Sequence, residues 1–192
     1  MGMEGKLRQI TEFELAAYRK DPAHPQGAEA IRRAPVAGFL EMQKQLQAIM
    51  SENPSAQAAV AGYIGISDCG KQLGLHKSWH CLHFLLTGRS WDAAEPPLGN
   101  AITGGTELPD RGKVMGYGPA RYLTPKQVGE VAAALAGFPA EERATAFDPE
   151  VADQQKVYVP HHDKEELLYY FGLLRDFYQD AAANGSVVLW VE

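Results

Sequence analysis

The sequence has few of the residues that mark specialised classes of protein. Only two cysteines, Cys69 and Cys81, occur among 192 residues, so we expect two thiols in a reducing compartment rather than a disulfide framework. No C-x-x-C pair is present, which argues against a structural zinc site. No apolar run approaches the ~18 residues that cross a bilayer, and MGMEGKLRQI lacks the pattern of a signal peptide. We therefore predict a cytoplasmic protein with no membrane partner.

Positive charge is also scarce and scattered along the chain. Lys and Arg number 18 against 24 Asp and Glu, which gives a formal net charge of −6. Proteins that bind nucleic acids need a basic surface that displaces counterions from phosphates, so we predict no nucleic-acid partner. Hydrophobic residues form 45% of the chain, which is enough to bury one sizeable core. We predict a single domain over residues 1–192.

Catalytic and cofactor signatures are missing as well. Neither G-x-S-x-G nor H-E-x-x-H occurs. The stretch GYGPARYL lacks the third glycine of a dinucleotide fingerprint, and its Pro119 has no N–H to offer a phosphate. The stretch GNAITGGT lacks the Gly-Lys-Ser/Thr ending of a phosphate loop. We predict no cofactor.

The patterns that are present predict helices and short strands. Gly5–Ile10 alternates weakly, and Ser186–Trp190 is β-branched and aromatic, so both are expected to be strands. Thr124–Gln127 combines a capping residue, a first-turn proline and a capping-box glutamine, which predicts a helix start. Apolar residues spaced by four and three after Asp163 predict the longest helix. Without a regular βαβ rhythm, these elements indicate an α+β fold, with several helices packed on a small, mainly antiparallel sheet.

Three histidines gather around the stretch KSWHCLHFLLTG, which spans Lys77–Gly88. We predict a helix over Leu75–Thr87 that ends at the glycine. At about 100° per residue, His76, His80 and His83 fall on one stripe beside the apolar face. His83 lies closest to that face and is expected to be partly buried. It is either a core-edge histidine with satisfied ring nitrogens or a pocket histidine that binds a ligand or transfers a proton.

Two further readings of this helix follow from its spacing. His76 and His80 lie four residues apart, which is a sound geometry for a divalent metal. No acidic residue stands between them and no third ligand is in view, so metal binding is the weaker alternative. Cys81 points away from the histidine stripe and is expected to be a small buried hydrophobe.

Arg121 is the candidate anion ligand outside that helix, because a guanidinium suits bidentate anion binding. It can equally pair with an internal carboxylate beside a tight turn. In an enzyme acting on a small anionic substrate, His83 would be the acid–base and Arg121 the anchor. His80 or Tyr117 would then be an auxiliary donor. This hypothesis predicts that His83 and Arg121 converge in one cleft.

Four stretches occur in an order that resembles the YfbM-like family of small bacterial proteins, a domain of unknown function. They are MGMEGKLRQI, KSWHCLHFLLTG, GYGPARYLTP and LLYYFGLLRDFYQDAAANGSVVLW. The resemblance covers most of the chain and implies a compact α+β domain that usually stands alone. It implies no established activity and therefore no catalytic residues. The matching positions are Trp79, His83, Gly88, Gly118, Pro119 and Arg121.

Because no catalytic set can be chosen, we predict a non-catalytic binding or interaction module. Its partner is expected to be an unknown protein, a small anionic ligand or a second copy in a homodimer. The alternative is an enzyme with a pocket formed by His83 and Arg121. The weaker alternative is a divalent-metal-binding protein that uses His76 and His80.

Overall fold

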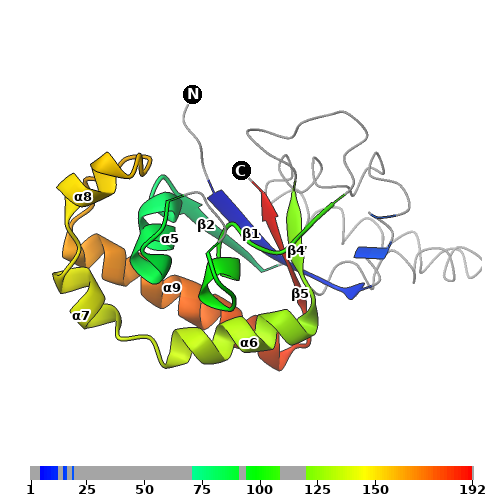
Figure 1. Ribbon diagram of the computed structural model, residues 1–192. Coiled ribbons are helices and arrows are strands. Elements are labelled where there is room, and N and C mark those ends of the chain that lie inside the picture. The colour runs from blue at the N-terminus through cyan, green and yellow to red at the C-terminus, as the bar shows by residue number, and fades with distance from the viewer. Residues whose placement is uncertain are drawn as a thin grey trace, which may run out of the picture.

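The computed structural model describes residues 5–12, 15–16, 19, 71–90, 94–108 and 120–191. In this part of the chain five strands form one sheet in the order β2-β1-β5-β4-β3 (Figure 1). All neighbouring strands are antiparallel, which confirms the predicted α+β fold with an antiparallel sheet. The strands are β1 (Gly5–Ile10), β2 (Gln72–His76), β3 (Thr106–Glu107), β4 (Arg121–Leu123) and β5 (Val187–Val191).

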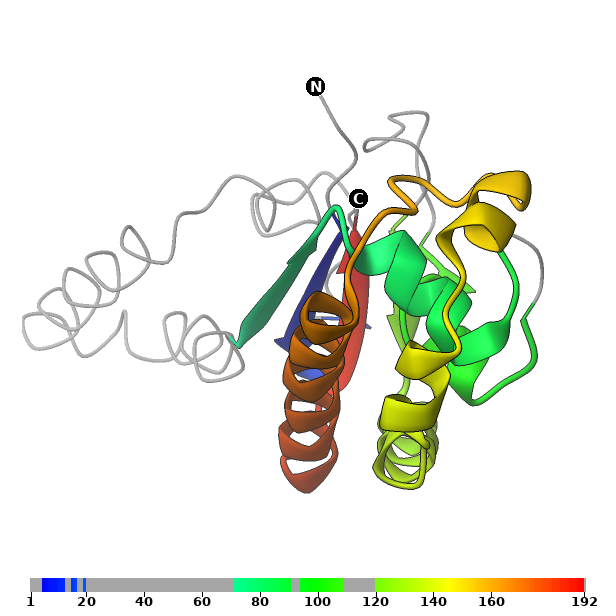
Figure 2. The ribbon, with the colours of Figure 1, turned by 90° about the vertical axis from the view of Figure 1, so that its left-hand side faces the viewer.

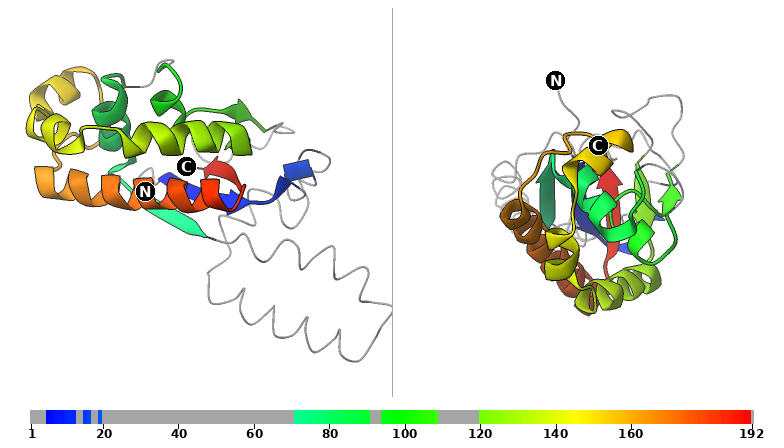
Figure 3. Two further views of the ribbon diagram at one scale, coloured as in Figure 1. Left: turned by 90° about the horizontal axis from the view of Figure 1, so that it is seen from below. Right: turned by 60° about the vertical axis from the view of Figure 1, so that its left-hand side comes forward.

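Helices cover one face of this sheet. They are α5 (Trp79–Thr87), the short 3₁₀ helix η1 (Leu98–Asn100), α6 (Pro125–Ala136), α7 (Ala140–Thr145), α8 (Pro149–Gln154) and α9 (Lys164–Ala183). Helices α6 and α9 lie side by side and run in opposite directions (Figures 1 and 3). Helices α5, α7 and α8 gather at one end of this layer (Figure 2). Among the described helices, none combines the length and the hydropathy of a membrane-spanning segment.

The helix starts follow from capping residues. Thr124 accepts a hydrogen bond from the backbone N–H of Gln127, whose side chain accepts in turn from the N–H of Thr124. This reciprocal arrangement satisfies two N–H groups that the first turn of a helix leaves open. Asp148 and Asp163 cap α8 and α9 through their carboxylates, which accept backbone N–H groups of the first turn. The predicted starts of α6 and α9 are therefore confirmed.

The alternation of β1 explains why the sheet has two apolar faces. Leu7 packs into the large cluster beneath the helices, whereas Ile10 joins a smaller cluster with Tyr122 and Val187. Gln9 is buried on the helix side, where its amide donates to the carbonyl of Phe177 at 3.3 Å. Because successive side chains of a strand point to opposite faces, a shift of one residue would bury the wrong set.

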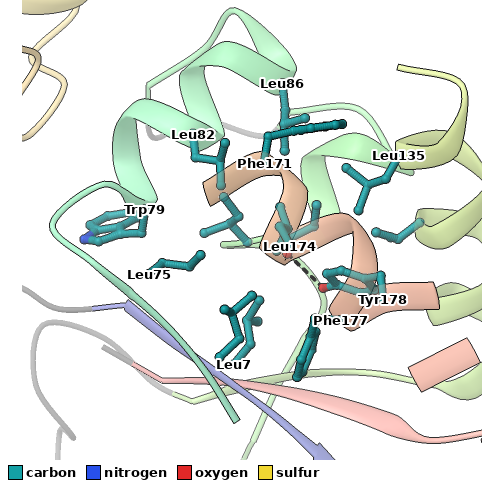
Figure 4. Close-up of a cluster of buried hydrophobic side chains, with 14 of the residues drawn as sticks. Leu7, Leu75, Trp79, Leu82, Leu86, Leu135, Phe171, Leu174, Phe177 and Tyr178 are labelled. Atoms are coloured by element: carbon teal, nitrogen blue, oxygen red, sulfur yellow. Dashed lines mark hydrogen bonds between the residues drawn. The ribbon is translucent and has the colours of Figure 1, made fainter. Parts of the chain in front are cut away.

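The main core joins α5, α9 and the sheet. Figure 4 shows Leu75 and Leu82 beside Leu174 of α9, and Trp79 belongs to the same buried cluster. The Tyr178 hydroxyl is fully buried and donates to the carbonyl of Ala101 at 2.8 Å, which ties α9 to the segment after η1. A buried hydroxyl without such a partner would cost several kilocalories per mole, so this bond fixes the pairing of the two elements.

The predicted start of the histidine helix is wrong. Helix α5 begins at Trp79, and Leu75 and His76 belong to β2, where His76 lies opposite Gly5. Residues 72–76 alternate between exposed and buried positions, and Leu73 and Leu75 enter the core. This period of two is that of a strand. His76 therefore ends a strand with an exposed side chain and does not share a helix face with His80.

Candidate functional site

Helix α5 buries both of its histidines. The side chains of His80 and His83 are 0% and 1% exposed, whereas the sequence predicted partial exposure for His83. The physical reason is that α5 is covered by η1 as well as by α9. A helix with one apolar face would leave the side of His83 open to solvent. In α5 that side is covered, so His83 lies in the core.

His80 has both ring nitrogens engaged. Its Nδ1 accepts a hydrogen bond from the backbone N–H of Tyr158 at 2.8 Å, and its Nε2 lies 3.1 Å from Oγ of Ser90. Because Nδ1 accepts, this network assigns the proton to Nε2, which donates to Ser90. Its ring also stacks on the indole of Trp79 at 4.7 Å. Burial lowers the pKa of His80 to about 4, so the ring is neutral near pH 7.

His83 is bonded on one side only. Its Nδ1 lies 3.4 Å from Oγ1 of Thr103, and its buried Nε2 has no hydrogen-bond partner in the described part of the chain. Burial, with a smaller contribution from His80, lowers the pKa of His83 to about 4. A neutral imidazole is the form that the core tolerates, because an unpaired buried charge is far more costly.

Cys81 is a structural thiol. Its Sγ donates to the carbonyl of Val159 at 3.0 Å, and burial together with Glu166 raises its pKa to about 12. The reactive form of cysteine is the thiolate, so this residue is not an activated nucleophile. Val159 has a φ of 50°, which is a sparsely populated region for a β-branched residue. Cys81 and His80 together therefore hold the strained connection between α8 and α9 against α5.

Arg121 does not meet the histidines. It lies on β4, where it forms an ion pair with Glu107 of β3, and its side chain is 34% exposed. Of the two roles that the sequence left open for Arg121, the structure therefore shows the pairing with an internal carboxylate. Tyr117 lies outside the described residues. Neither of the two hollows described below is lined by His83 or by Arg121.

An open groove lies elsewhere, between the end of α5 and the pair α7–α8. It consists of two adjoining hollows of about 230 and 690 Å³, which share Phe84, Gly88 and Val151. We call it the α5–α8 groove. The smaller hollow is also lined by Leu85, Arg143, Ala146, Phe147 and Asp148. The larger one is also lined by Thr87, Arg89, Ser90, Gln155 and Lys156.

Local structure positions the groove. Gly88 ends α5 with a φ of 69°, a left-handed conformation that glycine adopts without strain, and the chain turns there toward Arg89. Phe84 meets Phe147 edge to face, with ring centroids 6.2 Å apart. Val151 remains 44% exposed on α8, although large exposed apolar side chains are few in the described ranges. The groove therefore has an apolar half and a polar half.

The rim of the groove is cationic. Arg89, Arg143 and Lys156 are exposed, and none forms an ion pair in the part of the chain that the structure describes. The carboxylate of Asp148 instead accepts the backbone N–H groups of Glu150 and Val151 at the start of α8. On a chain with a net charge of −6, this is a local excess of positive charge.

Sequence reasoning missed these cations because they come from three separate elements and share no motif. One local signal was available. Lys156 follows the short helix α8 at the place where glycine commonly ends a helix, and it adopts a φ of 58°. A lysine in a left-handed conformation after a helix is unusual, and this local feature indicates that Lys156 can have a functional role.

Comparisons with known proteins agree with the fold. YfbM from Escherichia coli, a protein of unknown function with a crystal structure, matches with a TM-score of 0.60 and 16% sequence identity. The match covers 98% of each chain and indicates a shared fold. No curated protein matches the sequence. A family model described as a domain of unknown function (DUF1877) matches residues 1–191, which confirms the resemblance read from the sequence, and this chain belongs to that family.

Proposed function

We propose that this protein is a non-catalytic binding module and that the α5–α8 groove holds a small anionic ligand. One observation carries the proposal. Arg89, Arg143 and Lys156 surround a concave surface, and no carboxylate among the described residues pairs with them. Cationic walls around a concave surface focus the electrostatic field and raise the local concentration of anions.

The state of the reactive side chains favours binding over catalysis. His80 is neutral with both nitrogens bonded, and Cys81 is held as a thiol by burial. His83 has one nitrogen without a partner, but it is 1% exposed. A general base must come within hydrogen-bond reach of the substrate proton. None of these three groups reaches solvent in the part of the chain that the structure describes.

Titration calorimetry with inorganic phosphate and acetate tests the proposal. We expect saturable binding to the full chain that weakens as salt is added, because exposed charges are screened within about 10 Å at 0.1 M salt. Arg89→Gln and Lys156→Gln should each weaken it. Lys126→Gln is the matched control, since Lys126 is an 87% exposed lysine on α6, away from the groove. If phosphate and acetate bind all four proteins equally, the proposed site is wrong.

We also propose that the protein works in the cytoplasm. Cys81 is a free, buried thiol, which suits a reducing compartment. Fractionation of cells that express the chain at native level tests this location. Sedimentation velocity with and without phosphate tests the remaining partner proposals. A shift to twice the mass would favour a homodimer over a small ligand.

A further inference from the structure

The geometry points to one class of ligand: a small amphipathic anion. Its apolar portion would fill the hollow beside Phe84 and Phe147, and its carboxylate or phosphate would lie between Arg89 and Lys156. This inference rests on the proposed function, and adds to it the apolar half of the ligand.

The apolar half of the groove suits a short hydrocarbon chain or ring. The large apolar side chains that line the hollow of about 230 Å³ are Phe84, Leu85, Phe147 and Val151, and Arg143 and Asp148 line it as well. Val151 is 44% exposed, so a ligand there would remove apolar surface from water that folding leaves exposed. Ligand sites are typically concave and mostly apolar, with a few placed polar groups that fix orientation. This hollow adjoins such groups directly.

The polar half offers donors that suit an anionic head. Arg89 and Lys156 line the hollow of about 690 Å³, and Ser90 lines it with them. The N–H of Tyr158 occupies Nδ1 of His80, so Nε2 of His80 donates to the hydroxyl of Ser90. A hydroxyl that accepts through its oxygen still has its own hydrogen to donate. His80 therefore leaves Ser90 as a neutral donor beside two cations.

The walls of this half are held in place before any ligand arrives. His80 binds Ser90 on one wall and Tyr158 on the connection that follows Lys156. Cys81 binds the carbonyl of Val159 on the same connection. A site with fixed walls loses less conformational freedom on binding, which strengthens affinity for a ligand that fits.

Lys156 supplies independent support. Its N–H bonds to the carbonyl of Asp153, and the next N–H bonds to Ala152, so Lys156 ends α8 in the left-handed conformation. Glycine adopts that conformation without the clash that a Cβ introduces. Lys156 therefore combines a strained backbone with a cationic side chain that lines the groove. Strained residues cluster at ligand sites, where the side chain has a use that offsets the cost.

A purely structural role for the cations makes a different prediction. Arg143 lies in the last turn of α7, and Arg89 and Lys156 follow the C-terminal ends of α5 and α8, where positive charge offsets the partial negative charge of a helix. That role predicts that Lys156→Gly lowers the melting temperature. A ligand role predicts that Lys156→Gly keeps or raises the melting temperature, because strain is relieved, while binding weakens.

Calorimetry with a matched series of probes tests the inference on the full chain. The anions are acetate, butanoate, hexanoate and octanoate below micelle-forming concentrations, and octyltrimethylammonium is the cation of matched tail. We expect Kd to fall by about fourfold for each methylene until the hollow is filled, as burial of one methylene predicts. Val151→Ser should flatten this series. Lys156→Gly should weaken octanoate by about tenfold, as loss of one charged contact predicts, while Lys126→Gln should not.

Each outcome decides one question. If octanoate binds no more tightly than acetate, the apolar half of the ligand is refuted while anion binding in the groove stands. If octyltrimethylammonium binds as well as octanoate, the anionic head is refuted, and the proposed anion site with it. If the anions bind but Val151→Ser and Lys156→Gly change nothing, the ligand is not in this groove. If phosphate, acetate and octanoate all fail to bind, the proposed function fails together with the inference.

Discussion

Acid should destabilise this protein through the two buried histidines of α5. Burial lowers the pKa values of His80 and His83 from 6.5 to about 4. The unfolded chain therefore binds more protons than the folded chain between pH 4 and 6.5. Stability rises with pH across a range in which the unfolded state holds more protons. The contribution is complete above pH 6.5 and is lost as the pH falls toward 4.

The size of this effect follows from the same values. Proton linkage with a shift from 6.5 to about 4 gives a loss of roughly 2 kcal/mol per histidine between pH 7.5 and pH 5. Both histidines together should cost roughly 4 kcal/mol, which is a large fraction of the 5–15 kcal/mol typical of a folded domain. Part of the shift of His83 arises from His80, so the two contributions are coupled.

Urea unfolding at pH 7.5 and pH 5 measures the effect. His83→Gln removes one titrating group while keeping a polar side chain, so its loss of free energy on acidification should be roughly 2 kcal/mol smaller than that of the parent. Titrating carboxylates act equally in both proteins and cancel in this difference. His76→Gln, which alters an exposed histidine at the end of β2, controls for the substitution itself. If the parent and His83→Gln lose the same free energy, the reasoning about burial is refuted.

Four further predictions concern packing and burial. An ideal Cβ on Gly5 would lie 2.2 Å from an indole carbon of β5, so Gly5→Ala should cost about 1–3 kcal/mol in urea unfolding. An ideal Cβ on Gly129 of α6 would have no neighbour within 4 Å, so Gly129→Ala should instead stabilise the fold by about 0.5–1 kcal/mol. If both substitutions changed the free energy of unfolding in the same direction, the close contact at Gly5 would be contradicted. Tyr178→Phe leaves the carbonyl of Ala101 without its donor and should cost about 1–3 kcal/mol, whereas a neutral result would mean that the bond is replaced. Cys81 should resist iodoacetamide at pH 8 until the chain unfolds, because it is buried and its pKa is raised. Alkylated Cys81 in peptide mass spectra of rapidly labelled native protein would contradict this prediction.

Local rules were enough to predict much of the fold. The strand Gly5–Ile10, the strand near Ser186–Trp190 and the starts of α6 and α9 depend on alternation and capping, which neighbouring residues determine. These features were readable because each is completed within a few residues. The strand β2 was missed because its alternation spans only five residues and runs directly into the histidine segment.

The α5–α8 groove could not be predicted from the sequence, because it depends on residues that are far apart in the chain. Its cations lie at the ends of three different helices, and only the packing of α7 and α8 beside α5 brings them together. No periodic pattern encodes that arrangement, since each cation is an ordinary exposed residue in its own segment. The backbone of Lys156 is the exception, because a lysine at a glycine position is visible once α8 is recognised.

The burial of His83 shows how a helical wheel can mislead. A wheel assigns one apolar face to a helix and assumes that the opposite flank meets water. Helix α5 instead buries seven of its nine residues, because η1 and α9 cover it from two sides. The sequence did contain this information: Trp79–Thr87 has no Asp, Glu, Lys or Arg at any position. A helix without charge on any face is one that solvent does not reach, and a histidine in such a helix should be expected in the core, neutral, whatever its angle on the wheel.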